Sequence, residues 1–330
     1  MVIRLVAALV AALFCSVSAH AQATSPLAQS AARPEFHDFI QGVRRDALRQ
    51  GISSATLDRA FADVAYLPHV IELDHRQPET TLTFQEYIDR VVTPARRVRG
   101  RELLTENRAL LNAVSRKYGV PARFIVALWG IESDFGRLTG NFSEIGALAT
   151  LAYDGRRSAF FRKELINALV VVQRMHVDPR KMTGSWAGAM GQSQFMPSSF
   201  LNYAVSWTGD GPPDIWTNKA DVFASIANYL AHVGWRPEEG WGIAVSRPAA
   251  LDPTLVGLGQ RKPLAAWAAL GFVQANGGAL QDAHTAASLI EPGGDSGPAL
   301  LVFDNFRVIL RWNNSSYFAT AVGYLADAVD

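Results

Sequence analysis

Apolar residues recur at helical spacing from Pro34 to Gly234, and this periodicity limits the fold more than any other feature of the chain. Glycine or proline closes most of the periodic segments, as is common at helix ends. The pattern predicts a mainly α-helical protein. One helical face near the start, for example, carries Phe36, Phe39, Ile40 and Val43.

The pattern changes after Trp235. Residues 236–305 are rich in proline and glycine and contain short apolar runs at 286–290 and 299–303, which are typical of strands. We therefore expect a small β-hairpin element near the C-terminus, followed by a last helix at about 316–328. Residues 74–81 are polar and include a proline, which predicts a loop.

Hydrophobic residues make up 49% of the chain and charged residues 18%, so a sizeable core can form. No segment between residues 34 and 328 resembles a linker. We expect one domain over 34–328, with a helical lobe at about 34–117, a core at about 118–245 and a C-terminal lobe at about 246–328.

The first 21 residues resemble a secretory signal peptide. A positive Arg4 precedes an apolar run over residues 5–17, and Ala19-His20-Ala21 matches a small-x-small cleavage site. This predicts an exported, periplasmic protein that begins at Gln22, with a flexible leader at residues 22–33.

The only cysteine, Cys15, lies inside this predicted signal peptide. It follows Phe14, whereas a lipoprotein signal places a small residue at that position. We therefore expect a soluble product that is not lipid-anchored and that has no disulfide or thiolate metal site.

Without Arg4, 30 basic and 30 acidic side chains remain, which gives no electrostatic reason to expect nucleic-acid binding. The basic stretch at 96–101 is more typical of a solvated helix face. No later segment has a long uncharged apolar run, so no transmembrane helix is predicted. The histidines lack a compact ligand spacing, which argues against a zinc enzyme.

A carboxylate stands out in the helix that is predicted to begin at Pro121. Ile125, Leu128, Trp129 and Glu132 follow the i, i+3, i+4, i+7 spacing, which places Glu132 on an apolar face. Desolvation favours the protonated form of a carboxyl, so Glu132 can act as a general acid. A structural ion pair with a buried arginine is the alternative interpretation.

A glycine-rich run at residues 184–199 supplies side chains suited to sugars. Its glycines allow the backbone to approach a ligand closely. Gln194 offers a donor and an acceptor for hydroxyl and acetamide groups, and Phe195 and Trp186 offer apolar faces. Near the carboxylate, Ser133 can orient Glu132 through a hydrogen bond.

At these motifs the chain resembles the lytic murein transglycosylases of the membrane-bound B type, and the resemblance covers roughly residues 34–328. The motifs stand in the order of that family. They are Glu132-Ser133-x-Phe135-Gly136, Arg156-Arg157 before a Phe-Phe pair, the run from Gly188 to Ser199, Ala227-Asn228-Tyr229-Leu230, and Arg311-Trp312-Asn313-Asn314-Ser315.

The resemblance implies a lysozyme-like catalytic core with Glu132 as the catalytic residue. Trp312 stands where the family usually has a tyrosine, which keeps an aromatic face but loses a hydroxyl. With Ser133 added from its place beside Glu132, the expected substrate-binding residues are Ser133, Ser185, Gln194, Phe195, Tyr229 and Asn313, and also Tyr87, Arg156 and Arg157.

The implied reaction cleaves the bond between N-acetylmuramic acid and N-acetylglucosamine in peptidoglycan. Glu132 acts first as acid and then as base, and the product has a 1,6-anhydromuramic end. The sequence shows no second carboxylate in a comparable setting, as a two-carboxylate glycosidase would need. A hydrolytic muramidase and a non-catalytic peptidoglycan-binding protein remain as alternatives. Proteins of cell-wall synthesis or hydrolysis are candidate partners.

The acidic loop at residues 206–221 resembles a calcium-binding loop. Asp210 and Asp214 stand at two ligand positions, and Asp221 matches a further acidic position of the family. Ser206 and Thr217 replace the Asp and Glu of strong calcium sites. A metal-free loop is therefore favoured, calcium remains an alternative, and no other cofactor is expected. A run at 294–298 that resembles a protease motif is better explained as a hairpin turn.

Overall fold

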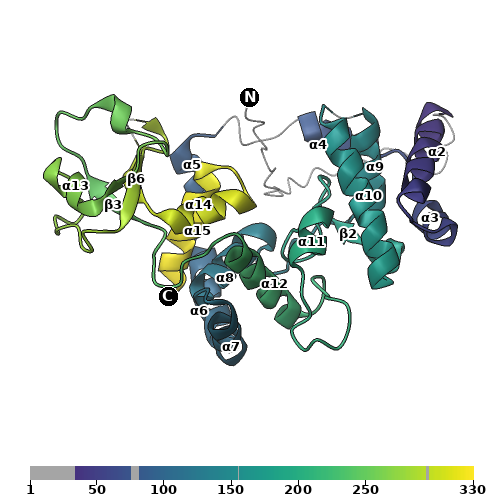
Figure 1. Ribbon diagram of the computed structural model, residues 1–330, viewed down its shortest axis with the longest axis horizontal. Coiled ribbons are helices and arrows are strands. Elements are labelled where there is room, and N and C mark those ends of the chain that lie inside the picture. Colours follow the sequence, from purple (N-terminus) through teal and green to yellow (C-terminus); the bar gives the residue numbers. More distant parts are fainter. Residues whose placement is uncertain (1–33, 76–81, 155, 295–296) are drawn as a thin grey trace. The chain divides into compact units, whose positions relative to one another are not determined.

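The computed structural model describes residues 34–330 except 76–81, 155 and 295–296 (Figure 1). The predicted signal peptide, Cys15 and the leader lie outside the described residues. The described chain forms two compact units, and their boundaries differ from the three lobes expected from the sequence. We call residues 34–75 and 132–226 the glycine-loop unit, and residues 82–131 and 227–330 the sheet unit.

The glycine-loop unit is built around two neighbouring helices, α9 and α10 (Figure 1). Their facing residues, among them Leu148, Leu151, Leu165 and Leu169, are fully buried. The remaining helices of the unit pack against this pair. The bounds are α2 Pro34–Arg49, α3 Ser54–Phe61, α4 Pro68–His75, α9 Glu144–Asp154, α10 Ser158–Met175 and α11 Pro197–Tyr203, with the short 3-10 helix η2 at Pro179–Lys181.

A two-stranded ribbon closes this unit near the glycine-rich run. Strand β1 (Phe142–Ser143) pairs antiparallel with β2 (Thr183–Gly184). The backbone of Glu144, directly after β1, donates a hydrogen bond to Met182 O at 3.0 Å. The ribbon therefore fixes the start of α9 beside the start of the glycine-rich run.

The sheet unit contains a five-stranded antiparallel sheet in the order β4-β6-β7-β3-β5. Its core includes Trp267, Phe272, Leu289 and Leu301, each 1% exposed or less. The strands are β3 Gly242–Ser246, β4 Lys262–Pro263, β5 Val273–Gln274, β6 Ala286–Ile290 and β7 Ala299–Val302, with η3 at Pro253–Leu255.

Helices form the rest of the sheet unit, and α15 contacts α5, α6 and α14. Two helices, α8 and α12, cross the boundary between the units. The bounds are α5 Phe84–Val91, α6 Pro94–Glu106, α7 Arg108–Tyr118, α8 Ala122–Ser133, α12 Lys219–His232, α13 Leu264–Ala269, α14 Asp304–Trp312 and α15 Ser316–Val329.

The prediction of a mainly α-helical fold is confirmed, as are the strands expected at 286–290 and 299–303. The sheet is larger than the expected hairpin, because β3, β4 and β5 join it. The prediction of a loop at residues 74–81 was wrong for residues 74 and 75, because α4 continues to His75 and buries Asp74. No helix in the described part of the chain is long and apolar enough to cross a membrane.

Close packing between α15 and Trp241, the residue before β3, depends on a glycine in the helix. A Cβ on Gly323 would overlap the indole ring of Trp241, which is itself 3% exposed. The Trp241 Nε1 also donates a hydrogen bond to Asp327 on the same helix at 2.9 Å, so the ring is held on two sides. The indole therefore has little freedom to move away from a larger residue.

We expect Gly323→Ala to lower the free energy of unfolding by about 1–3 kcal/mol, because overpacking outweighs the better helix propensity of alanine. Urea unfolding measures the change. Gly259→Ala is the control, since a Cβ there meets nothing within 4 Å. Equal stability of the two variants would contradict the packing explanation.

Candidate active site

Glu132 lies in the last turn of α8. Every residue from Phe124 to Ile131 is buried, so this helix is enclosed on all sides and does not have the single apolar stripe that the spacing suggested. Glu132 is half-buried, and it is the first position along the helix after this buried stretch where the side chain regains access to solvent. A ligand can therefore reach a carboxyl whose supporting helix is held firmly in the core.

The backbone after α8 turns sharply in the left-handed region. Asp134, Phe135 and Gly136 have φ angles of 50°, 60° and 82°. Positive φ is unfavourable for residues other than glycine and often marks sites where the surrounding structure enforces a strained geometry. Arg137 forms an ion pair with Asp134 across this turn. Asp134 therefore belongs to the turn.

Ser133 joins the end of α8 to the glycine-rich run. Its hydroxyl, on a residue 1% exposed, donates to Gln192 O at 2.7 Å and accepts from Gly136 N at 3.0 Å. A hydroxyl has only one proton to donate. Because that proton goes to Gln192, Ser133 supports Glu132 by fixing the backbone that follows it to the glycine-rich run.

Gln192 extends this connection to the acidic loop, a role that the sequence analysis did not assign. Its backbone N–H donates to Ile215 O at 2.8 Å, and its Nε2 donates to Trp216 O at 2.8 Å. Three segments therefore meet at Gln192: the end of α8, the glycine-rich run and the acidic loop. In the sequence, the only indication of this role was the position of Gln192 inside the glycine-rich run.

Gln194 is half-buried and has φ of 50°. Its Nε2 donates to Gly191 O at 2.8 Å and to Thr139 O at 3.1 Å, which uses both amide protons. This arrangement fixes the direction of the amide and leaves its oxygen as the group that can accept a hydrogen bond from a sugar hydroxyl or acetamide N–H.

Ser185, Phe195 and Trp186 are buried, with 2%, 2% and 8% exposure. The Ser185 Oγ accepts hydrogen bonds from Ala187 N and Ala189 N at 3.3 and 3.1 Å, which shapes the start of the run. Both aromatic rings lie in the interior. This geometry therefore does not support the prediction that they offer open faces to sugar rings.

Arg156 and Arg157 hold a buried carboxylate. Both lie 3.4 Å from oxygens of Asp74 at the end of α4, and Arg156 also donates to Asp74 O at 2.8 Å. Arg157 stacks on Phe161, with 5.0 Å between its guanidinium carbon and the ring centroid. The two arginines therefore connect α4 to the start of α10, in addition to any contact with substrate.

The sheet unit contains the remaining predicted residues. Tyr229 on α12 donates from its hydroxyl to Arg311 O at 2.7 Å, and its ring meets Trp312 edge-on at 4.7 Å. Asn313 follows directly and is 3% exposed, and its Oδ1 accepts no hydrogen bond from a described residue. Tyr87 packs its ring against Tyr317 at 5.7 Å. The structure thus brings Tyr229 and Asn313 into one cluster.

A second carboxyl, Glu144, lies beneath the glycine-rich run and was not selected from the sequence. It is fully buried, and neither of its oxygens has a hydrogen-bond partner in the described chain. A Cβ on Gly184 would lie 2.6 Å from Oε2, which shows how closely the run covers this carboxyl. Burial, assisted by the charge of Glu164, raises the pKa of Glu144 well above its usual value.

The acidic loop is closed by its own carboxylates. Asp221, 2% exposed, accepts from Trp207 N and Asp214 N at 2.8 Å each, one bond to each oxygen. Asp214 in turn accepts from the backbone of Trp216 and Thr217 at 2.8 and 2.9 Å. Burial alone would raise the pKa of Asp214, but these bonds and that of the Thr217 hydroxyl outweigh it and lower the pKa.

These contacts do not fit a calcium site made of Asp210, Asp214 and Asp221. Calcium needs six to eight oxygen ligands, and two of the three carboxylates already bind backbone N–H groups. No cluster of three or more His, Cys, Asp or Glu side chains that could hold a metal ion occurs among the described residues. In the metal-free loop, Asp214 and Asp221 therefore already have hydrogen-bond partners.

Comparison with known proteins agrees with the motifs. The model of the family described as transglycosylase SLT domain matches residues 35–327. The chain is 31% identical over 294 residues to membrane-bound lytic murein transglycosylase B of Escherichia coli (strain K12), which covers 85% of this chain and 79% of that protein.

Solved structures show the same similarity. SltB3 from Pseudomonas aeruginosa in complex with NAG-anhNAM-pentapeptide is 44% identical with a TM-score of 0.86, over 90% of this chain and 80% of that chain. The Escherichia coli lytic transglycosylase Slt35 in complex with calcium is 30% identical with a TM-score of 0.75, over 90% of this chain and 92% of that chain.

The buried carboxyl leads to a prediction about stability and pH. The pKa of Glu144 in the folded protein is raised. The contribution of this carboxyl to the free energy of unfolding is therefore fully present below the pKa of an unfolded glutamate, about 4.3, and is lost as the pH rises through the folded pKa. We expect Glu144→Met to raise the free energy of unfolding at pH 7 by about 1–3 kcal/mol, because it removes two unpaired buried oxygens. The gain should shrink towards pH 4.

Urea unfolding across this pH range measures the effect. Glu35→Met, at an exposed position of α2, is the matched control and should show no pH-dependent gain. A destabilised Glu144→Met protein at pH 7 would show that the carboxyl is needed in the fold.

The acidic loop gives a second prediction. We expect Asp221→Asn to destabilise the protein by about 1–3 kcal/mol, because the amide nitrogen of asparagine cannot accept one of the two backbone bonds. Hydrogen exchange at Trp207 and Asp214 should accelerate, whereas exposed Asp210→Asn should leave it unchanged.

Calcium added to chelator-treated protein should give no saturable heat in calorimetry, and tight binding would refute the self-closed loop.

Proposed function

This chain belongs to the transglycosylase SLT domain family, and on that premise we propose that it cleaves the glycan strands of peptidoglycan with Glu132 as its single acid and base. Its relatives are lytic murein transglycosylases, so the chain is an enzyme that acts on peptidoglycan. The observation that carries the assignment of Glu132 is its half-buried position at the end of an enclosed helix, beside the strained turn.

The proposed reaction needs one proton donor. Protonated Glu132 gives its proton to the oxygen that links C1 of N-acetylmuramic acid to the next N-acetylglucosamine, and the C1–O bond breaks. The acetamide of the muramic acid stabilises the positive charge at C1. Glu132, now a carboxylate, takes the proton from the C6 hydroxyl while O6 bonds to C1. The product is a 1,6-anhydro ring, and Glu132 ends protonated again.

A fixed backbone around the carboxyl favours this mechanism. Ser133, Gln192 and Gly136 hold the end of α8 to the glycine-rich run, so the carboxyl does not need to reorganise when substrate binds. The amide oxygen of Gln194 is a suitable acceptor for an acetamide N–H. We also propose Tyr229 and Asn313, which belong to the sheet unit, as sugar-binding residues on the resemblance to the family alone.

A hydrolytic muramidase differs only in that water attacks C1, which leaves a reducing end. A binding protein without catalysis would release no fragments. Since the relatives of this chain are lytic transglycosylases, we favour the enzyme. We also propose export to the periplasm, which suits the substrate and the predicted signal peptide.

We expect Glu132→Gln to reduce the release of anhydromuropeptides from purified sacculi by at least about 100-fold, since glutamine cannot transfer the proton. Mass spectrometry of the products gives both rate and chemistry. Asp134→Asn is the control, because asparagine tolerates the left-handed backbone at that position. Normal release by Glu132→Gln would remove Glu132 from the mechanism, and reducing ends from the wild type would indicate hydrolysis.

A further inference from the structure

The sheet unit has a half-open cavity of about 480 Å³ that no step of the proposed reaction uses. It lies between the segment that joins α12 to β3 and the loop that precedes β6, and its size falls within the roughly 300–1,000 Å³ of small-ligand sites. All the residues that line it belong to the sheet unit.

The inner wall of the cavity is apolar. It is lined by Ile243 from β3, Leu264 from the start of α13 and Phe303 after β7. Leu264 and Phe303 belong to the core of the five-stranded sheet, and Ile243 packs against that core. Leu264 and Phe303 are only 3% and 8% exposed. A ligand that enters here meets hydrocarbon at the base of the cavity.

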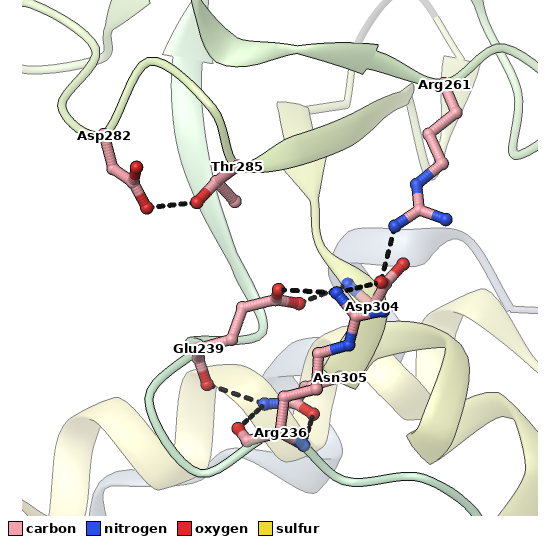
Figure 2. Close-up of polar contacts among 7 residues, drawn as sticks. All are labelled: Arg236, Glu239, Arg261, Asp282, Thr285, Asp304 and Asn305. Carbon is pink, nitrogen blue, oxygen red and sulfur yellow. Dashed lines mark hydrogen bonds and ion pairs between the residues drawn. The ribbon is translucent and has the colours of Figure 1, made fainter.

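A balanced ion network fixes one side of the rim (Figure 2). The Arg236 guanidinium lies 2.6 Å from Asp304 and 3.4 Å from Glu239, and Arg261 pairs with the same Asp304. Glu239 also accepts from Asp304 N at 2.6 Å, and Asn305 donates to the carbonyl oxygens of residues 236 and 239. Two cations and two anions therefore neutralise one another.

Two further carboxylates on the rim carry uncompensated charge. Glu238 and Asp282 both line the cavity and are exposed, and neither is ion-paired within the described chain. Asp282 accepts a hydrogen bond from the Thr285 hydroxyl (Figure 2). The cavity thus has a negative rim over an apolar base.

Two further polar groups at the rim, Thr285 and Gln274, present acceptors. The Thr285 proton is used by Asp282, and the Gln274 Nε2 donates to Ala279 O at 2.8 Å, which leaves the amide oxygen of Gln274 as an acceptor. An ammonium group has three donors and no acceptor, whereas a sugar hydroxyl is both. This rim therefore suits an ammonium better than a sugar.

We propose that this cavity binds a primary ammonium group on an aliphatic chain, with the hydrocarbon against Ile243 and the charge between Glu238 and Asp282. A stem peptide that carries the free side-chain amine of a diamino acid has this chemistry. This part of the inference rests on the proposed function, since SltB3 was crystallised with a pentapeptide-bearing fragment and this chain acts on the same polymer. The cavity would then recognise uncross-linked peptides.

The test is a titration of the full chain with the tripeptide L-Ala-γ-D-Glu-L-Lys and with its Nε-acetylated form, followed by the methyl NMR signal of Ile243. We expect the free amine to shift this signal and acetylation to weaken binding by about 10-fold, because a charge-assisted hydrogen bond is lost. Glu238→Gln and Asp282→Asn should each weaken binding by about 2–5-fold, as expected for exposed charge pairs. Glu106→Gln, on α6, is the matched control.

Equal affinity for both peptides, or an Ile243 signal that does not move at saturation, would overturn the inference. Unchanged binding in both rim variants would do the same. The titration does not require catalysis, so Glu132→Gln protein should bind the tripeptide like wild type. If the glycan-cleaving assignment is wrong, the products released from sacculi will show it. If the inference about this cavity is wrong, only the peptide titration will show it.

Discussion

The hydrogen bonds at Gln192 determine whether the candidate active site keeps its shape. Its carbonyl oxygen accepts from Ser133 at the end of α8, and its backbone and side-chain nitrogens donate to Ile215 and Trp216. Without this junction, three segments that are distant in sequence would have no shared anchor. The positive φ angles of Asp134, Phe135 and Gln194 are tolerable because the surrounding bonds hold these residues in place.

The same reasoning separates residues that keep some exposure to solvent from residues that support the shape of the site. Ser185, Phe195 and Trp186 are buried, so their contribution is the shape of the glycine-rich run. Glu132 is half-buried at the end of α8, and Gln194 is half-buried with its amide oxygen left as an acceptor. The glycine-rich run thus combines buried side chains that shape it with a half-buried amide that can accept a hydrogen bond.

The helices and the glycine-rich run were predictable because helical periodicity and glycine content are local properties of the sequence. Strands β4 and β5 were not, since a two-residue strand is too short to show an alternating pattern. The spacing predicted a single apolar face for the helix that carries Glu132, whereas residues 124–131 of α8 are buried on every face. The spacing could not reveal Gln192 or Glu144, because their roles depend on backbone carbonyls and carboxyls contributed from elsewhere in the chain.

The buried Glu144 also affects how the protein behaves in an electric field. The formal charge of zero, counted from residue 22 onwards, treats every glutamate as an anion. Between the ordinary pKa of a glutamate and the raised pKa of Glu144, the folded chain holds one proton that the unfolded chain has released. Within this pH range Glu144 therefore gives the native protein one more unit of positive charge than the unfolded chain has, and folding takes up a proton from the medium.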